Sequence, residues 1–561
     1  MYNKAQKIRL AFTSLVYLLL LIFVLFRLLD LQVLNNRNFT KLADSQHLLK
    51  LTLYPQRGII YDCNHKVLAL SLKVFSVYAD PRLIEDKEGT AALLAQTLDL
   101  DEDWVLKRID RDRAFVWIKR WLPENEARGI RELSLPGVDL INENKRYYPN
   151  GELAAHVIGF AGMDERGLDG VELVYNEYLK GQRGRRSLLR DAKQRMLPAF
   201  EYEYYPAIDG YNVVLTIDQM IQHIVEEELD KAMAQNNALA GSVIVMDPND
   251  GSILALANRP AFDLNKFVSS LAEERRNRAI ADFYEPGSTF KIITASSALQ
   301  EKAVTMDETF FCENGAYRVA SHVLHDHHPL GTLSVVQIIE KSSNVGAVKI
   351  AQKLGEQLLY KYIKLYGFGR ETGIDLPGES PGYFRDLSQW SKLSIAAIPM
   401  GQEIGVTVLQ MVRAMAAIAN GGELVTPHVL NKIIDNQGEE IKNFSAPQKK
   451  RVISAKTSQE MKEILSGVVR QGTGTRAQID GYSSAGKTGT AQKLNAEGGY
   501  SHSKFVASFI GFAPVEDPKF VIAVVFDEPH PQYYGGTVSA PVFKNIAEKI
   551  LKYMDIPKQA D

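Results

Sequence analysis

The sequence predicts an α+β protein behind one N-terminal membrane anchor, and three observations lead to this prediction. A long apolar stretch opens the chain, and apolar strand-like runs lie at both ends of its second half, with helical stretches between them. Three short motifs follow one another in that half: Ser288-Thr-Phe-Lys291, Ser342-Ser-Asn344 and Lys487-Thr-Gly-Thr490. With 561 residues, the chain is long enough for several domains.

The apolar stretch runs from Leu10 to Phe26 without a charge. Lys4, Lys7 and Arg9 precede it, so the positive-inside rule places the N-terminus in the cytoplasm and exports the residues after about 35. A cleaved signal peptide is the alternative, but it has a shorter apolar region and a cleavage site with small residues. The segment that follows, 27–33, has no small residue, which favours an anchor.

We expect three parts: residues 1–35 as cytoplasmic tip and anchor, 36–225 as a mixed, charged segment, and 226–561 as an α+β domain. In the mixed segment we expect a strand over 49–54 and helices over 84–98, 100–110, 167–178 and, with Asp218 as N-cap, 219–235. Strands of one antiparallel sheet are expected over 241–246, 252–257, 507–512 and 520–526. Helices are expected over 290–301, 334–341, 344–354, 356–366, 407–420, 457–471 and 541–554.

Composition excludes few classes of function. The formal net charge is −2, so no basic excess points to nucleic acid. Cys63 and Cys312 fit no metal-binding spacing; an exported region allows a disulfide between them, but two unpaired thiols are favoured.

The first motif suits a lysine-assisted serine nucleophile. Pro286 and Gly287 end the preceding segment, and a buried-looking helix is predicted to begin at or just after Ser288. Lys291 then shares a helical face with Ser288, and burial lowers the pKa of a lysine until its neutral amine acts as a general base. Two other SxxK matches, 484–487 and 501–504, are rejected, because the first lies at a strand and the second in a loop.

The second motif is predicted to lie at a turn before a helix. There the hydroxyl of Ser342 relays a proton and the amide of Asn344 binds a peptide group of the substrate. Read alone, this motif is a helix N-cap.

The third motif fits a strand along a cleft. Lys487 supplies charge and Thr488 and Thr490 supply hydroxyls for a carboxylate, while Gly489 lets a substrate backbone approach. The backbone N–H groups of Ser288 and Thr490 are candidates for an oxyanion hole. Read alone, it is an ordinary strand with a bulge.

Taken together, the motifs resemble those of the penicillin-binding protein and serine β-lactamase superfamily. Motifs earlier in the chain are similar to the pedestal motifs of class B penicillin-binding proteins: Arg57-Gly58 with Asp62, Arg146 with Tyr148-Pro149, Gly167 with Gly170 and Glu172, and Thr216-Ile-Asp218. The resemblance implies an elongated pedestal domain and a transpeptidase domain with an antiparallel sheet and an inserted helical subdomain. One departure is His65, where the family has glycine, so the turn 62–65 is expected to change type.

The resemblance implies a peptidoglycan D,D-transpeptidase without cofactor or metal. Ser288 attacks the D-Ala–D-Ala bond of a donor stem peptide, D-Ala leaves, and an acceptor amine takes the acyl group. Lys291 is the expected general base, and whether it acts directly or through Ser342 stays open. β-Lactams are expected to acylate Ser288, peptidoglycan strands from lipid-linked precursors are the substrates, and a SEDS-family glycosyltransferase and other cell-division membrane proteins are the implied partners in the bacterial cytoplasmic membrane.

The context Lys341-Ser-Ser-Asn-Val-Gly346 is most similar to the division-specific, septal, FtsI-type enzymes. The elongation-specific class B enzyme is the alternative, and a β-lactam sensor, a β-lactamase or a non-catalytic division scaffold are alternatives of another class. A cluster of His322, His325, Asp326, His327 and His328 invites a metal site, but a loop that borders the cleft is favoured, since the resemblance implies no metal.

Overall fold

The structure is a computed structural model that describes residues 3–38, 48–190, 196–320, 322–444, 449–495 and 498–558. The chain forms two compact units, residues 1–56 with 181–209, and residues 57–180 with 210–561. The first unit contains helix α1 (Lys4–Leu29), a π-helical turn (Asp30–Leu34) and the strands β1 (Leu48–Leu53), β6 (Gly184–Arg190) and β7 (Met196–Tyr205). These strands form one antiparallel sheet in the order β1-β6-β7.

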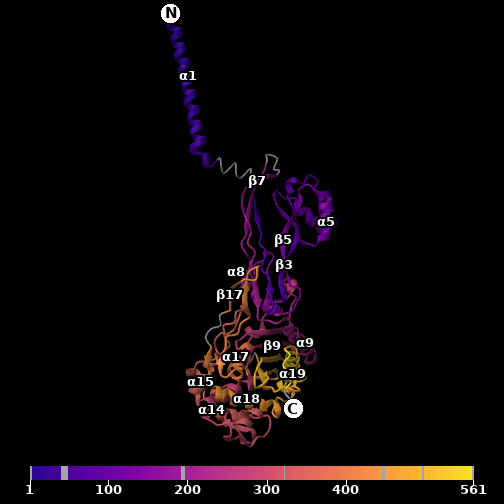
Figure 1. Ribbon diagram of the computed structural model, residues 1–561, viewed down its shortest axis with the longest axis vertical. Coiled ribbons are helices and arrows are strands. Elements are labelled where there is room, and N and C mark those ends of the chain that lie inside the picture. The colour runs from indigo at the N-terminus through magenta and orange to yellow at the C-terminus, as the bar shows by residue number, and fades with distance from the viewer. Residues whose placement is uncertain are drawn as a thin grey trace. The chain divides into compact units, whose positions relative to one another are not determined.

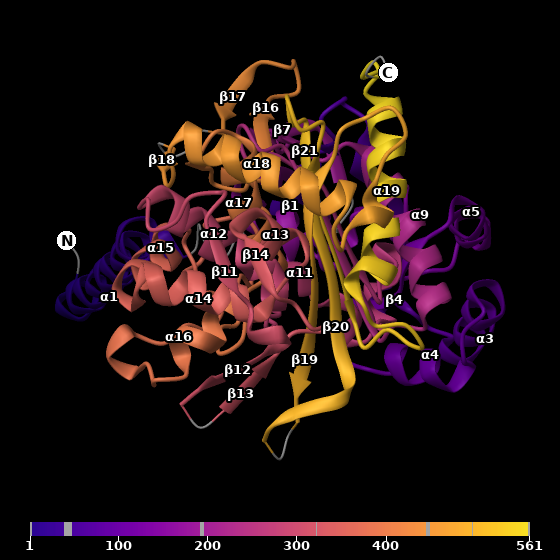
Figure 2. The ribbon, with the colours of Figure 1, turned by 90° about the horizontal axis from the view of Figure 1, so that it is seen from below.

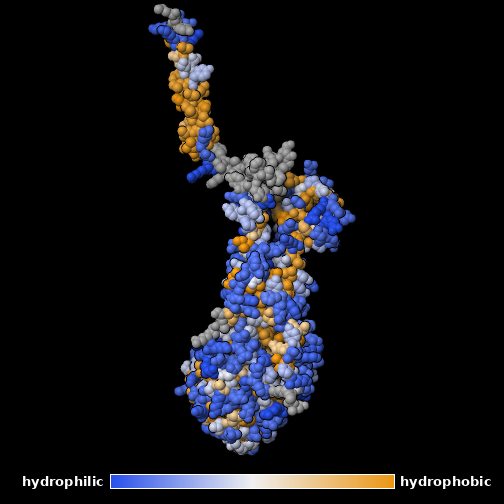
Figure 3. Space-filling view, in the orientation of Figure 1, coloured by the Kyte–Doolittle hydropathy of each residue, from blue (hydrophilic) through white to orange (hydrophobic). Residues whose placement is uncertain are grey.

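Helix α1 is the one helix within the described ranges that is long and apolar enough to cross a membrane. With the turn that follows, it spans 31 residues, and none of its side chains is buried. A bilayer core needs about 20 apolar residues. On the face that Figure 3 shows, apolar side chains cover the middle of the helix, and Arg27 near its end pairs with Asp30 over 2.7 Å. The helix is therefore a candidate membrane anchor, as predicted.

The second unit begins with a seven-stranded sheet in the order β17-β16-β8-β2-β3-β4, with β5 paired to β3. Its strands are β2 (Ile60–Tyr61), β3 (Val67–Ala79), β4 (Val116–Leu122), β5 (Val138–Tyr147), β8 (Asn212–Leu215), β16 (Leu430–Ile434) and β17 (Glu440–Asn443). Helices α3 (Lys87–Leu98), α4 (Glu102–Ile109) and α5 (Glu124–Leu133) enclose a separate small core with β3 and β4. Because β16 pairs with β8, this sheet ties the pedestal motifs to the later part of the chain.

Residues of three of the pedestal motifs meet in one buried ion cluster. Glu172, which lies in the short helix α7 (Gly170–Val174), accepts hydrogen bonds from Nε of Arg57 and Nε of Arg146, each over 2.6 Å. Tyr148 donates to the same carboxylate over 3.3 Å. Burial would raise the pKa of Glu172, but the charges and hydrogen bonds of Arg146 and Arg57 hold it below its ordinary value. Motifs about 115 residues apart thus form one packing unit.

The second sheet of this unit has five strands in the order β10-β9-β21-β20-β19, all antiparallel. They are β9 (Ala240–Met246), β10 (Ile253–Arg259), β19 (Ala485–Leu494), β20 (Tyr500–Ala513) and β21 (Phe520–Asp527). Strands from the start and the end of this part of the chain share the sheet, as the sequence predicts, and β19 lies at its edge.

Helices cover both faces of that sheet (Figure 2). One face packs against α9 (Gln219–Asn236) and α19 (Gly535–Tyr553), and the other packs against α17 (Val408–Ala419) and the helices beyond it. Those are α12 (Lys291–Gln300), α13 (Val335–Glu340), α14 (Asn344–Leu354), α15 (Glu356–Leu365), α16 (Ser394–Ala397) and α18 (Ala455–Arg470). Figure 1 colours the same elements by sequence position.

Four local predictions need correction. Helix α19 begins at Gly535 rather than at residue 541, although Pro541 lies inside it. Residues 167–178 form two short helices, α7 and α8 (Asn176–Leu179), instead of one. The match at 501–504 lies within β20 and not in a loop, but it remains outside any helix. His65 adopts φ 59°, in the region that glycine favours, so the turn keeps a left-handed residue there.

Cys63 and Cys312 are both free thiols, which confirms the prediction that they are unpaired.

Candidate active site

Ser288 lies in a turn of 3-10 helix (Gly287–Phe290) directly before α12. The α-helix begins at Lys291, so the serine precedes the helix by one turn instead of opening it. Gly287 has φ 55°, and its N–H donates to the carbonyl of Gly401 over 3.1 Å. Ser288 is half-buried, and within the described ranges no group forms a hydrogen bond with its hydroxyl. The hydroxyl is therefore free to meet a substrate.

Two glycines let other segments approach this turn. A Cβ on Gly401 would lie 2.1 Å from the carbonyl oxygen of Gly287. A Cβ on Gly489 would lie 2.3 Å from Oγ of Ser508 and 2.9 Å from Cγ2 of Thr289. The sequence predicts that Gly489 lets a substrate backbone approach. Its side-chain position faces the catalytic turn, so the glycine brings β19 and that turn together.

Lys291 is fully buried, and its Nζ lies within hydrogen-bonding distance of three oxygens. These are the carbonyl oxygen of Ser342 at 2.6 Å, Oδ1 of Asn344 at 2.8 Å and Oγ of Ser342 at 3.3 Å. Burial lowers the pKa of Lys291 to about 7, against the opposing charge of Asp326. The neutral amine is thus populated near neutral pH, and it is directed at Ser342.

The segment 342–344 forms a strained turn ahead of α14. Ser342 has φ 58°, which is unfavourable for a residue with a Cβ. Ser343 caps α14 by accepting a hydrogen bond from the N–H of Gly346 over 3.0 Å. Asn344 donates through its side chain to the carbonyl of His325 over 2.8 Å. The capping explanation thus applies to Ser343, and it leaves the side chains of Ser342 and Asn344 for Lys291.

Asp326 holds this turn from the neighbouring loop. Its carboxylate accepts the hydroxyl proton of Ser343 over 2.8 Å and the N–H of Val345 over 3.2 Å, and it also accepts the N–H of Asn344. Sequence reasoning placed Asp326 only in the histidine cluster. Its spacing from the motif, 17 residues before Ser343, gives no signal of this contact.

Lys487 reaches the same serine from β19. Its Nζ donates to Oγ of Ser342 over 2.9 Å and to the carbonyl oxygen of Thr488 over 3.1 Å. It is fully buried, and burial, together with the charge of Lys291, holds its pKa well below the ordinary value. Two buried lysines therefore converge on one hydroxyl.

The hydroxyls of the third motif are engaged within the protein. Oγ1 of Thr488 is 2.7 Å from Oγ1 of Thr473, and Oγ1 of Thr490 accepts the N–H of Gly535 over 3.1 Å. The carbonyl of Thr488 accepts a hydrogen bond from Nζ of Lys487, so the backbone groups of Thr488 point away from β20. Alternate residues of a strand point their backbone groups the same way, so those of Thr490 also point away from β20. The carbonyl of Thr490 lies 3.1 Å from where a Cβ on Gly287 would be. The backbone of Thr490 thus faces the catalytic turn.

A cavity of about 190 Å³ opens beside Ser342. Its walls are Asp326, His327, His328, Leu330, Lys341, Ser342, Ser343, Gln471, Gly472 and Thr473. The ring of His327 meets that of Tyr534 edge-on, with centroids 5.8 Å apart, and burial and the charge of Lys291 lower the pKa of His327. The histidine-rich loop thus borders the cleft. Among the described residues, no three His, Cys, Asp or Glu side chains are placed to hold a metal ion.

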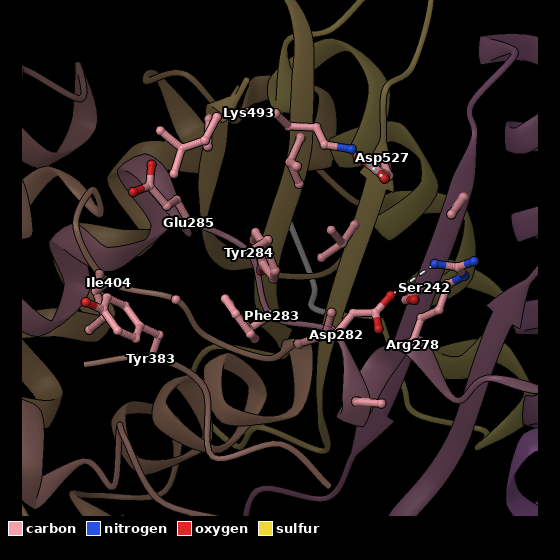
Figure 4. A pocket seen from close by; sticks show the side chains of 18 of the residues that line it. Ser242, Arg278, Asp282, Phe283, Tyr284, Glu285, Tyr383, Ile404, Lys493 and Asp527 are labelled. Atoms are coloured by element: carbon pink, nitrogen blue, oxygen red, sulfur yellow. Dashed lines mark hydrogen bonds and ion pairs between the residues drawn. The ribbon is translucent and has the colours of Figure 1, made fainter. Parts of the chain in front are cut away.

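A larger cavity, of about 770 Å³, contains none of the motif residues. Tyr284 and Glu285, which lead into the catalytic turn, form part of its wall (Figure 4). Its charged side chains pair with one another, for example Lys493 with Asp527 over 2.8 Å. The motif residues instead gather around Ser342, and that cluster is the candidate active site.

Two protein-family models match this chain. The penicillin-binding protein transpeptidase domain matches residues 241–548, and the penicillin-binding protein dimerisation domain matches residues 52–215. This chain belongs to the class B penicillin-binding proteins. As a member of that family it is a peptidoglycan D,D-transpeptidase.

Relatives of this class B penicillin-binding protein match along nearly its whole length. Stage V sporulation protein D of Bacillus subtilis is 35% identical over 562 residues, covering 99% of this chain and 87% of the relative. Peptidoglycan D,D-transpeptidase FtsI of Escherichia coli is 34% identical over 552 residues, covering 97% and 91%. The crystal structure of penicillin binding protein 3 of Mycobacterium tuberculosis, complexed with aztreonam, has a TM-score of 0.72 at 28% identity and covers 91% of this chain and 98% of its own.

Proposed function

We propose that this class B penicillin-binding protein forms peptidoglycan cross-links through an acyl-enzyme on Ser288, in the synthesis of the division septum. The observation that carries the proposal is the position of the Ser342 hydroxyl, which accepts from Lys487 over 2.9 Å and lies 3.3 Å from Nζ of Lys291. In this arrangement Lys291 activates Ser288 without the help of a histidine or a metal.

The first step is attack by Oγ of Ser288 on the carbonyl carbon of the penultimate D-Ala of a donor stem peptide. Neutral Lys291 has two N–H bonds, which suit its two short contacts, to the carbonyl of Ser342 and to Asn344. Its lone pair then faces the hydroxyl of Ser342, which is the longest of the three contacts. We therefore propose that the proton of Ser288 passes through Ser342 to Lys291.

The tetrahedral intermediate carries an oxyanion, which the N–H groups of Ser288 and Thr490 stabilise. It collapses when the C–N bond breaks, and the D-Ala nitrogen takes the proton back through Ser342. The acceptor amine then attacks the ester carbonyl, loses its proton by the same route and releases Ser288. Asn344 holds the acyl side, and Lys487, Thr488 and Thr490 hold the terminal carboxylate. The hydroxyls of Thr488 and Thr490 must exchange their present partners for that carboxylate.

The same chemistry makes β-lactams covalent inhibitors, because they present a strained amide to Ser288. A related solved structure is described as a complex with aztreonam and another as a complex with ampicillin. A fluorescent penicillin should label this protein covalently, and Ser288→Ala should abolish labelling. Rapid loss of label would favour a β-lactamase, and no label on the intact protein would favour a non-catalytic scaffold.

We further propose that the protein spans the cytoplasmic membrane once, with its N-terminus inside, residues 36–225 as pedestal and 226–561 as transpeptidase domain, and that it works with a SEDS-family glycosyltransferase. Depletion tests the cellular role. Filamentous cells would support septal synthesis, and rounded cells would support the elongation role instead. A defect confined to spore formation would favour the role that the name of the Bacillus relative suggests.

A further inference from the structure

Asp326 has a carboxylate at the active site that none of the three motifs includes. Asp326 follows β13 (His322–His325), which pairs with β12 (Ala316–Val319) in a two-stranded sheet away from the catalytic strand. The aspartate is half-buried beside the cavity at Ser342. Its two oxygens serve three donors on the turn before α14, two backbone N–H groups and one hydroxyl.

These contacts fix the turn that carries two partners of Lys291. Ser342 keeps φ 58°, and a strained backbone persists only where its surroundings hold it. The next three residues, Ser343 to Val345, each give a donor to Asp326. The carbonyl of Ser342 and Oδ1 of Asn344 then meet Nζ of Lys291 at 2.6 Å and 2.8 Å. Asp326 therefore acts on the lysine through its neighbours.

Asp326 also acts on Lys291 through space. Burial favours the neutral amine, and the charge of Asp326 opposes that effect. Among the described residues, Lys487, from β19, and His327, from the same loop as Asp326, also face Lys291, and the protonated form of either would add positive charge. Asp326 thus supplies negative charge beside a lysine whose other titratable neighbours, His327 and Lys487, are bases.

We propose that Asp326 is a positioning residue of the transpeptidase reaction: it holds Ser342 and Asn344 against Lys291 and supplies the negative charge beside that lysine. This inference rests on the proposed acylation of Ser288 with Lys291 as base. The role falls to the loop that follows β13, which the three motifs do not contain.

The test compares acylation by a fluorescent penicillin between pH 5 and 9 for the full-length protein, Asp326→Asn, Ser343→Ala and the control Asp307→Asn. In Asp326→Asn the charge is lost at nearly constant shape, so the pKa of Lys291 falls further. The rise of the acylation rate should move to lower pH by about one unit, and the maximal rate should fall about tenfold. The control Asp307→Asn, at an exposed residue of the same subdomain, should change neither the pH profile nor the maximal rate.

Ser343→Ala separates the two roles, because it removes the hydroxyl that donates to Asp326 and caps α14, and it keeps the charge of Asp326. Its rate should fall severalfold with the pH profile unchanged, and thermal melting should establish that each variant is folded. A wild-type pH profile in folded Asp326→Asn would overturn the inference. If Asp326→Asn fails to fold, a wild-type rate in Ser343→Ala overturns it. If the unmodified protein is never acylated, the proposed function itself fails.

Discussion

Lys291 and Lys487 lie on different elements, a helix and an edge strand, and both meet the hydroxyl of Ser342, at 3.3 Å and 2.9 Å. Two charged ammonium groups at one buried oxygen would repel each other strongly. Burial lowers the pKa of both lysines, that of Lys291 to about 7, so the neutral amine of Lys291 is populated near neutral pH. That neutral amine is what a serine nucleophile requires.

The pH dependence of acylation follows from Lys291. Because burial lowers its pKa to about 7, the neutral base is lost as the pH falls through that value. The rate of acylation by a penicillin should therefore rise about tenfold per pH unit below 7 and level off above it. Stopped-flow labelling between pH 5.5 and 8.5 measures this, and a flat profile would exclude Lys291 as the base.

Ser342 should show a conflict between stability and activity. Its φ of 58° costs a residue with a Cβ about 1 kcal/mol relative to glycine. Ser342→Gly should therefore be more stable than Ser342→Ala in urea unfolding by about that amount. Both variants lack the relay hydroxyl, so both should lose about 10²-fold or more of the acylation rate. Equal stability of the two would contradict the strain.

We expect Gly489 to be required for the geometry of the active site and not for backbone flexibility. In Gly489→Ala the new Cβ meets Ser508 and Thr289, which pushes β19 away from the catalytic turn. Acylation should fall by at least tenfold, as for other small displacements of reacting groups. Gly331→Ala is the matched control, because a Cβ there meets nothing within 4 Å. Equal rates for the two variants would rule out this role.

The buried cluster of Glu172, Arg57 and Arg146 should stabilise the pedestal. Glu172→Gln leaves two buried guanidinium groups without their carboxylate and should destabilise the protein by about 3–5 kcal/mol. Glu126→Gln, which breaks a partly exposed pair with Lys119, should cost at most about 1 kcal/mol. Urea unfolding of both variants gives the comparison, and similar losses would contradict the assignment.

The same cluster predicts how the stability of the protein changes with pH. The native pKa of Glu172 lies below its unfolded value, so its stabilising effect is complete above about 4.5 and is lost as the pH falls through the native pKa. The difference in stability between the wild type and Glu172→Gln should therefore shrink in acid. A difference that is constant down to pH 3 would contradict this.

Local sequence signals identified most regular elements of the transpeptidase part. Helix α14 runs from Asn344 to Leu354, as predicted, because Ser343 caps it and apolar residues follow at helical spacing. The pedestal strands β3 to β5 were missed, since their pairing depends on contacts between distant segments. The start of α19 was missed because a proline inside the helix reads as a break.

In the candidate site, too, contacts between distant segments could not be predicted from the sequence. The three motifs named Ser288, Lys291, Ser342 and Lys487, and the structure brings the last three into hydrogen-bonding contact. No spacing in the sequence indicated that Asp326 contacts Ser343, or that Gly489 faces Thr289. Such contacts form between loops, and only the folded chain determines them.

Peptide mapping by mass spectrometry, after brief incubation with a penicillin, tests the central claim most directly. We predict the mass of one intact penicillin on the peptide that contains Ser288, and none on the Ser288→Ala protein. A penicillin adduct on another peptide, or an unchanged adduct in Ser288→Ala, would contradict the account.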